Sequence, residues 1–425
     1  VEFNDIMNYY ISSLMVAIPI FSVLIGIEMI VAKRMKIQVN NPSDMISSLS
    51  SGITNTVRDG LKYGFIIISY TWLVDHITLY KLEPVWAAVV VAFFVEDFTE
   101  YWLHRLNHRV NIFWNRHIIH HSSEEFNLAC ALRQSISDTV KFGAILMIPA
   151  ALLGVPASIF SVLGPIHLFL QFWYHTRLID KMGWLEKVIV TPSHHRVHHG
   201  INPEYLDKNY SAIFIIWDKL FGTFQPELAN VKPVYGILRP ADTWNPIIIN
   251  FKHLWQLIQD AFHTEKWWDK IRIWFMPTGW RPEDVAKNYP VKTIENPFEQ
   301  IKYKTVNSPI LIRWAWLQMF ITFGFMFHLF MVSTRVEPTL IFLYALFLII
   351  NVFAYTSLLD GKKYAIYSEG IKFMLGVGFM WLQEFSWFGT EGKPAIIIGV
   401  YLFLSLGMTI YFLKAEPKSH QLTTS

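Results

Sequence analysis

Charged residues are scarce in this chain, at 16% of its 425 residues, whereas soluble globular proteins carry about a quarter. The net charge of +3 is too small and too scattered for a surface that binds nucleic acid. One cysteine, Cys130, excludes an internal disulfide and a metal site built from several thiolates. No glycine-rich dinucleotide motif and no haem-binding pattern is evident, so we expect any reductant to come from outside the chain.

Hydrophobic residues make up 53% of the chain and aromatic residues 16%, which is typical of proteins with long membrane interfaces. Long apolar runs predict about nine membrane-spanning segments. These are residues 9–32, 61–79, 85–103, 139–153, 156–174, 310–332, 338–359, 371–388 and 395–413. Because the run 139–153 is short for a bilayer of roughly 30 Å, some of these helices are expected to tilt, shorten or meet as a hairpin below the far surface.

Lysine and arginine gather in alternate connections between these runs. Examples are Lys33 and Arg34 after the first run, and Lys362 and Lys363 after the seventh. By the positive-inside rule, this distribution places the N-terminus outside and the C-terminus in the cytoplasm. The long polar stretch after residue 174 then faces the cytoplasm.

Composition divides the chain into three parts. Residues 1–280 are predicted to form one membrane domain, residues 281–305 a linker rich in proline and charge, and residues 306–425 a C-terminal membrane domain of four spans. Within the first part, residues 251–276 mix tryptophan with lysine and arginine. This mixture fits a helix lying in the membrane interface, and it fits equally a helix packed on the cytoplasmic domain.

Histidine is the unusual constituent, because eleven of the 16 histidines lie between residues 104 and 199. One HxxxH pair and two HxxHH triplets stand out: His104/His108, His117/His120/His121 and His195/His198/His199. On a helix, residues three or four apart share a face at about 5–6 Å. We therefore expect the first and second histidines of each triplet to bind one ion, and the third, turned by roughly 100°, to reach a second ion.

Together these clusters supply more imidazoles than the three or four that one mononuclear site uses, so they predict a dinuclear, all-nitrogen centre. Fe, Zn, Cu and Ni all accept imidazole. A surface pH switch or a chance basic patch is the alternative, and it suits one HxxxH pair better than three spaced clusters. His175, at the end of the fifth run, is a further ligand candidate, whereas the deeper His167 is expected to pack against its neighbours or support the ligands.

These clusters resemble the signature of the fatty acid hydroxylase and sterol desaturase superfamily of membrane non-haem di-iron enzymes. The resemblance implies nine metal ligands: His104, His108, His117, His120, His121, His175, His195, His198 and His199. Segments such as Ala131–Ser135 and Thr191–Gly200 look like the branch of this superfamily that cleaves glyceryl ethers, and the likeness covers most of the chain. Two positions depart from the pattern: Arg109 replaces an acid of the animal members, and Gln171 replaces a histidine of some relatives.

The runs and the clusters together predict an all-α integral membrane protein of about nine transmembrane helices with a cytoplasmic, histidine-rich helical di-metal domain, whose core is residues 85–225. The resemblance implies two iron ions, O2 as co-substrate and tetrahydrobiopterin as reductant. It also implies hydroxylation of the ether-linked carbon of an alkylglycerol lipid, after which the hemiacetal collapses to a fatty aldehyde and a glycerol derivative. The implied location is the endoplasmic reticulum membrane in a eukaryote or the inner membrane in a bacterium.

Other functions remain as alternatives. Sterol or fatty-acyl hydroxylation or desaturation is the alternative reaction within the same superfamily. A histidine-lined metal transporter would need ligands along a path inside the bilayer, whereas these clusters lie at the ends of spans. A structural zinc protein without catalysis is the remaining class.

Metal-bound imidazoles usually donate their distal N–H to an acceptor that fixes the ring. Glu100, which lies one turn before His104, and Asp218 are the predicted catalytic carboxylates. Asp97, His194, Asn127 and Arg133 are further candidates for supporting the ligands. Arg133 is also expected either to hold a phosphate or glycerol head group or to neutralise carboxylates.

The alkyl chain of the substrate is expected to enter a slot between the third, fourth and fifth spans. Residues such as Phe93, Phe94, Phe142, Phe169 and Phe172 would line this slot. Helix packing is the simpler explanation for any single one of these phenylalanines.

Overall fold

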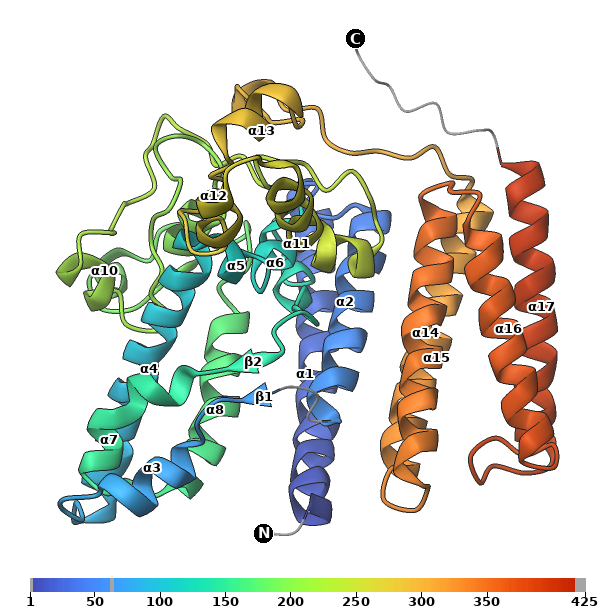
Figure 1. Ribbon diagram of the computed structural model, residues 1–425, viewed down its shortest axis with the longest axis horizontal. Coiled ribbons are helices and arrows are strands. Elements are labelled where there is room, and N and C mark those ends of the chain that lie inside the picture. Colours follow the sequence, from blue (N-terminus) through green and yellow to red (C-terminus); the bar gives the residue numbers. More distant parts are fainter. Residues whose placement is uncertain (1–2, 62–64, 417–425) are drawn as a thin grey trace.

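The computed structural model describes residues 3–61 and 65–416, with side chains from residue 16 onward, and helices account for nearly all of its regular secondary structure (Figure 1). The first helices are α1 (Phe3–Met35), α2 (Pro42–Gly60), α3 (Tyr70–Ile77), α4 (Val85–Arg109), α5 (Asn111–Trp114), α6 (Ile118–His121), α7 (Ile148–Leu152), α8 (Ala157–Phe172), α9 (Pro192–His198) and α10 (Ile216–Leu220). They are followed by α11 (Pro246–His263), α12 (Trp267–Arg272), α13 (Glu283–Asn288), α14 (Pro309–Val332), α15 (Pro338–Leu359), α16 (Ala365–Leu382) and α17 (Lys393–Ala415). Two short strands, β1 (Phe65–Ile66) and β2 (Val140–Lys141), pair in parallel.

Four helices in the described part of the chain are long and apolar enough to cross a membrane. They are residues Val16–Met35 of α1, and α14, α15 and α17. Helices α14 to α17 form a bundle at one side of the molecule (Figure 1). Helix α16 belongs to this bundle but is less apolar, because it carries a buried ion pair between Lys372 and Glu369, with Nζ and Oε1 2.6 Å apart.

Two of the predicted spans, residues 61–79 and 139–153, are not continuous helices. Residues 62–64 of the first run lie outside the described residues. The remainder of these runs contains the β1–β2 pair and the short helices α3 and α7. Pro149 lies in the first turn of α7, where its missing N–H costs no helical hydrogen bond, and it therefore favours a helix that starts there. Ile66 and Val140 are β-branched residues that favour strands. Nine full-length spans are therefore not found among the described residues.

Helix α2 lies between the histidine-bearing half of the molecule and the C-terminal bundle (Figure 1). Its apolar side places Ile46, Ile53 and Val57 in the core of the bundle. Its polar side faces the other half, where the Ser51 hydroxyl donates a hydrogen bond to the carbonyl of Gln134 at 2.8 Å. This helix was not among the predicted spans, and its serines make it more polar than a membrane-spanning helix.

Helix α1 is bound to the histidine-bearing half through the buried side chain of Glu28. The Glu28 carboxylate accepts hydrogen bonds from the backbone N–H of Leu128 at 2.8 Å and from the Thr176 hydroxyl at 2.6 Å. Thr176 directly follows His175, so this contact fixes the chain beside a predicted ligand.

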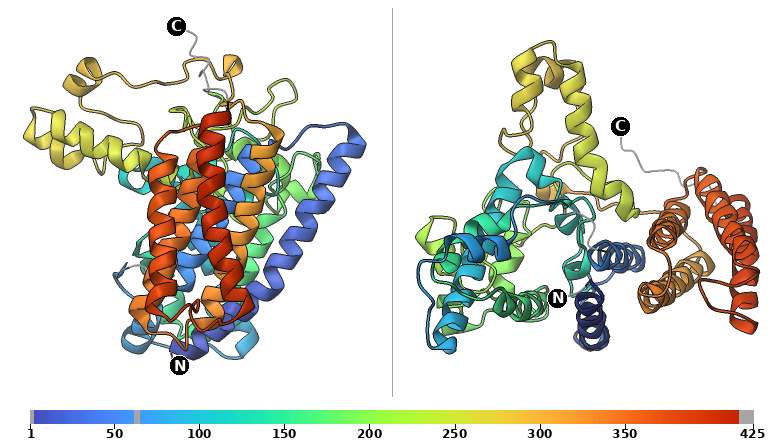
Figure 2. Two further views of the ribbon diagram at one scale, coloured as in Figure 1. Left: turned by 90° about the vertical axis from the view of Figure 1, so that its right-hand side faces the viewer. Right: turned by 60° about the horizontal axis from the view of Figure 1, so that its bottom comes forward.

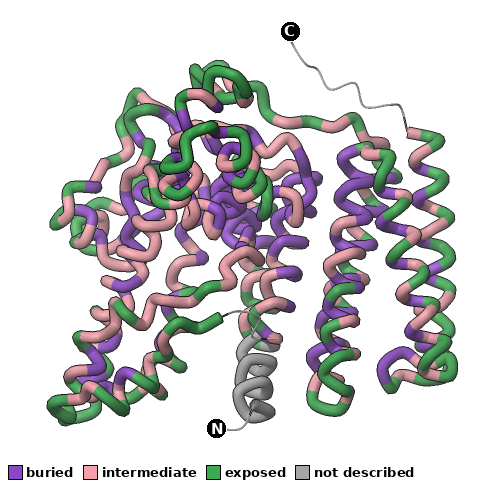
Figure 3. The backbone as a smooth tube through the Cα atoms, in the orientation of Figure 1, coloured by how far each residue is buried: buried purple, intermediate pink, exposed green. Residues whose placement is uncertain are grey.

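The histidine clusters lie at the end of the long helices where α17 finishes, opposite the start of α1 (Figure 1). Burial is most complete around α6 and α9, whose residues are all buried, and along the facing sides of the bundle helices (Figure 3). The clusters and the end of α17 thus lie at the same end of the molecule, as the distribution of lysine and arginine predicts.

Candidate metal centre

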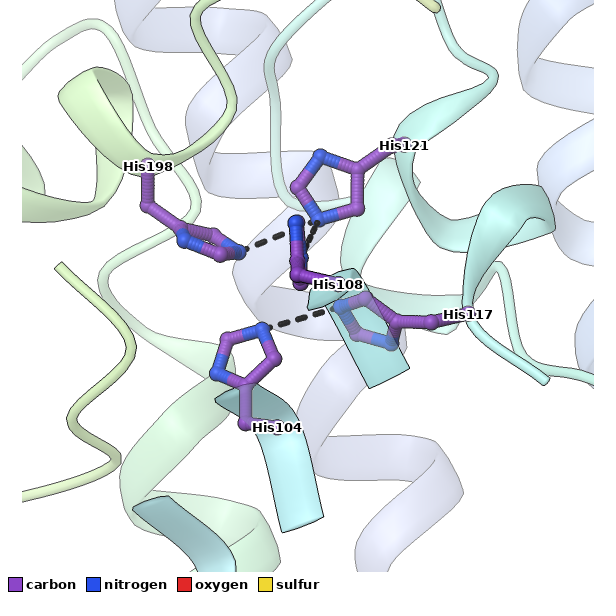
Figure 4. Close-up of side chains that lie close together, drawn as sticks. All are labelled: His104, His108, His117, His121 and His198. Atoms are coloured by element: carbon purple, nitrogen blue, oxygen red, sulfur yellow. Dashed lines mark hydrogen bonds between the residues drawn. The ribbon is translucent and has the colours of Figure 1, made fainter. Parts of the chain in front are cut away.

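The nine histidines of the predicted ligand set lie together in two groups. The first group is His104, His108, His117, His121 and His198, and the second group is His120, His175, His195 and His199. In each group, one ring nitrogen from every residue lies within 4.8 Å of all the others. Figure 4 shows how the five rings of the first group point toward one another; they come from α4, from α6 and the residue just before it, and from α9.

The two triplets contribute to both groups. His117 and His121 belong to the first group, whereas His120 between them belongs to the second; the triplet at residues 195–199 divides in the same way, with His198 in the first group. The expectation that the first and second histidines of each triplet share an ion is therefore wrong. A four-residue spacing offsets two helical side chains by about 40°, and a three-residue spacing by about 60° in the opposite sense, so the middle histidine points away from the outer pair.

The spacing between ring nitrogens is that of ligands around a shared ion. The Nε2 atoms lie 2.9 Å apart in His104 and His117, 3.0 Å in His121 and His198, 2.8 Å in His175 and His195, and 3.1 Å in His120 and His199. Two imidazole nitrogens that bind one ion at about 2.0–2.1 Å, at right angles to each other, lie about 3 Å apart. The donor set therefore fits two metal ions.

These imidazoles are held in the neutral form that binds metals. Burial lowers the pKa of His117, His121 and His198 well below its ordinary value, and the neighbouring imidazoles lower it further. A neutral imidazole leaves one ring nitrogen with a free lone pair.

Backbone carbonyls fix four of the rings from behind. The Nδ1 atoms lie 2.8 Å from the Tyr210 carbonyl in His104, 3.2 Å from Arg133 in His120, 3.0 Å from Gln171 in His175 and 3.0 Å from Lys208 in His198. Such contacts leave Nε2 as the ligand atom. Only side-chain partners were predicted from the sequence. A backbone carbonyl cannot be recognised there as a partner, because every residue provides one.

A carboxylate that the sequence analysis did not single out lies behind His108. Asp207 Oδ1 is 3.6 Å from His108 Nδ1, and Asp207 Oδ2 is 3.1 Å from Arg109 Nη1. Burial raises the pKa of Asp207, but the contact with His108 and the charge of Arg109 outweigh this and hold the pKa below its ordinary value. Arg109, the unusual residue of the first cluster, therefore pairs with an acid that supports a ligand.

Two predicted carboxylates support the backbone and contact no imidazole. Asp218 accepts hydrogen bonds from the backbone N–H of Tyr210 at 2.8 Å and from the Thr223 hydroxyl at 2.7 Å. It thus holds the residue whose carbonyl contacts His104. Asp97 accepts hydrogen bonds from the backbone N–H of Ile213 and from the Trp217 indole, both at 2.8 Å.

Arg133 acts within the protein. Its guanidinium, in a side chain that is 2% exposed, contacts Asp44, Ser48 and Ser122. It therefore neutralises a carboxylate, and its position leaves no access for a lipid head group. Asn127 likewise supports local structure, donating a hydrogen bond to the Val39 carbonyl at 2.7 Å.

The neighbouring histidines outside the two groups have other surroundings. His194 Nδ1 lies 3.5 Å from the Thr191 hydroxyl, and the ring is in neither group. His167 is buried against Phe93, with ring centroids 4.5 Å apart.

The first group is the more accessible of the two. His104 and His117 are partly exposed, whereas the other seven histidines are buried. Glu100 is also partly exposed and lies one turn before His104 on α4.

The five phenylalanines expected to line one slot pack in separate places. Phe94 stacks on Phe214 at 5.0 Å and Phe142 lies 5.1 Å from Phe113, while Phe169 and Phe172 contact Phe21 of α1 at 6.0 and 4.2 Å. Each of these four has an aromatic partner within the protein, although Phe94 and Phe169 also remain exposed.

Comparisons with known proteins agree with this geometry. The sequence pattern of the fatty acid hydroxylase family matches residues 89–223. The chain is 32% identical over 372 residues to the alkylglycerol monooxygenase of Homo sapiens, covering 87% of this chain and 82% of that protein. It is 31% identical over 405 residues to that of Xenopus tropicalis, covering 95% and 89%, and 32% identical over 382 residues to that of Danio rerio, covering 87% and 81%. No solved structure matches the chain.

Proposed function

The chain belongs to the alkylglycerol monooxygenase family, and on this basis we propose that it is a di-iron membrane monooxygenase that cleaves the ether bond of alkylglycerol lipids. The reaction uses O2 and tetrahydrobiopterin. One oxygen atom of O2 enters a C–H bond of the ether-linked carbon, and the other is reduced to the level of water with two electrons from tetrahydrobiopterin. The resulting hemiacetal breaks into a fatty aldehyde and a glycerol derivative.

The observation that carries this proposal is the pair of histidine groups, with five and four ligand nitrogens at metal-ligand spacing. Bound to these groups, iron supplies the redox chemistry that oxidation of an unactivated C–H bond requires and that acid–base side chains lack. Backbone carbonyls such as those of Tyr210 and Lys208 hold Nδ1 of the rings, which directs Nε2 toward the ion. We assign to Glu100, which is partly exposed one turn before His104 on α4, the holding or moving of a proton near that histidine.

A lipid substrate suits the surroundings of the site. Helix α4 leads along the chain to His104, and helix α8 leads to His175. Both helices expose apolar side chains before these histidines, among them Val90, Phe94, Ile166 and Phe169. An alkyl chain in the membrane can lie against these surfaces while the polar head reaches the histidine groups. We place the catalytic domain within residues 1–280 and the metal groups on the cytoplasmic face of the membrane.

The decisive test uses the full chain, loaded with iron and reconstituted in lipid. Incubation with an alkylglycerol, O2 and tetrahydrobiopterin should release a fatty aldehyde in amounts that depend on the pterin, and omission of either co-reactant should abolish it. No aldehyde from folded, iron-loaded protein would overturn the proposal. A hydroxylated or desaturated sterol or acyl chain, formed under the same conditions, would instead identify the alternative reaction of the superfamily.

A further inference from the structure

Helix α11 exposes an apolar stripe along one side. Phe251, Trp255, Ile258 and Phe262 follow the spacing of one helical face, and all four are exposed. The opposite side is buried through residues such as His253 and Leu257. The inner face of the helix packs on the protein, and the exposed outer face is apolar as well.

The stripe continues beyond the turn into α12. Trp267, Trp268, Ile271 and Phe275 are exposed there, and the exposed fractions of Phe262 and Trp267 reach 79% and 77%. Lys266, Lys270 and Arg272 lie among these side chains. Exposed tryptophan and phenylalanine beside lysine and arginine are typical of helices that lie in a membrane interface.

A cleft shows at which depth this surface lies. The cleft has a volume of about 390 Å³ and is lined on one side by Phe251, Lys252 and Trp255 of α11. Its other side includes Lys362 and Tyr364, which form the turn just after α15, one of the membrane spans. The start of α11 is therefore level with the end of a span, where acyl chains give way to head groups.

The direction in which α11 and α12 extend agrees with a position at this depth. Figure 2 shows residues 246–276 extending sideways from the body of the protein, and its left view shows them crossing the direction of the bundle helices. A helix that starts level with the end of a span and runs across the spans stays close to the plane of the membrane surface.

We propose that residues 246–276, here called the arm, lie in the interfacial layer of the leaflet on the side of the metal centre. The apolar stripe contacts acyl chains, and the exposed Lys266 faces lipid phosphates. Lys270 donates hydrogen bonds to the carbonyls of Ala261 and Phe262, and Arg272 pairs with Asp269, so these two cations stabilise the arm itself. The occupant of this surface is the lipid bilayer, and the proposal holds whichever lipid reaction the metal centre performs.

The arm connects the membrane surface to the chain between the first two histidine clusters. His253 Nε2 lies 2.8 Å from the Asn111 carbonyl, and the Leu254 backbone N–H donates a hydrogen bond to the Asn115 side chain at 3.0 Å. The Asn111 backbone N–H in turn donates to the Met276 carbonyl at 2.9 Å. A lipid-bound arm would thus fix the orientation of the metal centre relative to the bilayer.

The test exploits the single cysteine, because Cys130 is buried and leaves introduced cysteines as the reactive ones. The variants Phe262→Cys and Trp267→Cys are labelled with an environment-sensitive fluorophore in the full chain, reconstituted in discs of phosphatidylcholine and phosphatidylserine. Lys287→Cys on α13, an exposed polar position of the linker, is the matched control. Lipids carrying a quencher on the acyl chain should quench the two arm labels several-fold more than the control, and aqueous iodide should show the reverse order.

Two outcomes would overturn the proposal. Iodide quenching at residues 262 and 267 that equals quenching at residue 287 would place the arm in water. Protection of both labels from both quenchers would place the stripe against protein. Ile258→Cys and Phe275→Cys provide second sites on the same stripe, and bound metal, measured on each labelled sample, shows that the fold is retained.

Discussion

Arg133 and Asp44 form an ion pair inside the protein, with Nη2 and Oδ1 2.8 Å apart and side chains 2% and 4% exposed. Asp44 lies on α2, which packs against the C-terminal bundle, and the carbonyl of Arg133 lies 3.2 Å from Nδ1 of His120. Arg133 thus links α2, which packs against the C-terminal bundle, to His120 of the second histidine group.

Breaking this pair should strongly destabilise the protein. Asp44→Asn leaves the Arg133 cation buried without its counter-charge, which typically costs about 3–5 kcal/mol. We expect a lower midpoint of thermal unfolding and weaker metal retention. Lys292→Ala is the control, because Lys292 pairs with Asp242 at the surface and such pairs contribute about 0–1 kcal/mol. Equal shifts in the two variants would contradict the assignment.

The two histidine groups should lose metal separately. His198→Ala and His195→Ala each remove a ligand from a different group, and each should lower the metal content from about two ions per chain toward about one. His194→Ala changes the adjacent ring, which belongs to neither group, and it should retain both ions. Metal analysis of the purified variants measures this, and a loss in His194→Ala equal to the others would refute the grouping.

The two predicted catalytic carboxylates should fail in different ways. Glu100→Gln should keep both metal ions while turnover of an ether lipid falls by about 10²-fold or more, because positioned proton transfer is worth that much. Asp218→Asn disturbs the backbone of Tyr210 that holds His104, so we expect metal to be lost along with activity. Metal content and single-turnover rates, measured on the same samples, separate these effects. Metal loss in Glu100→Gln would argue that Glu100 supports the fold.

Glu124 should make stability depend on pH. Burial raises the pKa of Glu124 from 4.5 to about 7, although hydrogen bonds from the Tyr303 backbone and Gln300 partly oppose this. The folded state therefore favours the protonated acid, so its contribution is full below pH 4.5 and is lost as pH rises toward about 7.

Glu124→Gln retains a hydrogen-bond acceptor and removes the charge. The unfolding midpoint of this variant should therefore rise relative to that of the parent protein as pH increases from 4.5 to about 7. Glu299→Gln, at an exposed position of the linker formed by residues 281–305, controls for the loss of one negative charge. A constant difference between Glu124→Gln and the parent at all pH values would contradict the prediction.

The C-terminal bundle was largely predictable from the sequence. The runs 310–332, 338–359 and 395–413 became helices Pro309–Val332, Pro338–Leu359 and Lys393–Ala415, because hydrophobicity and length suffice to indicate a span. The run 371–388 was placed too late, since the helix there is Ala365–Leu382. Glu369 and Lys372 interrupt the apolar pattern of the sequence, but their mutual ion pair makes both tolerable inside the helix bundle.

The broken runs near residues 61–79 and 139–153 were predictable only in outline. Apolar composition does not distinguish one continuous helix from short helices and strands that pack on the same protein. The 15-residue length of the second run indicated that it is short for a full span, and Pro149 within it is a second local signal.

The sequence by itself determined the membrane character of this protein and which nine histidines gather in its two groups, because apolar runs and the HxxxH and HxxHH spacings are local patterns. Only the tertiary structure decided how these histidines divide, since His117 and His121 meet His198 across the fold while His120 joins His195 and His199. It also decided what holds the rings, because carbonyls such as that of Tyr210 leave no mark on residue identity. Long-range packing sets these contacts, and no local pattern specifies them.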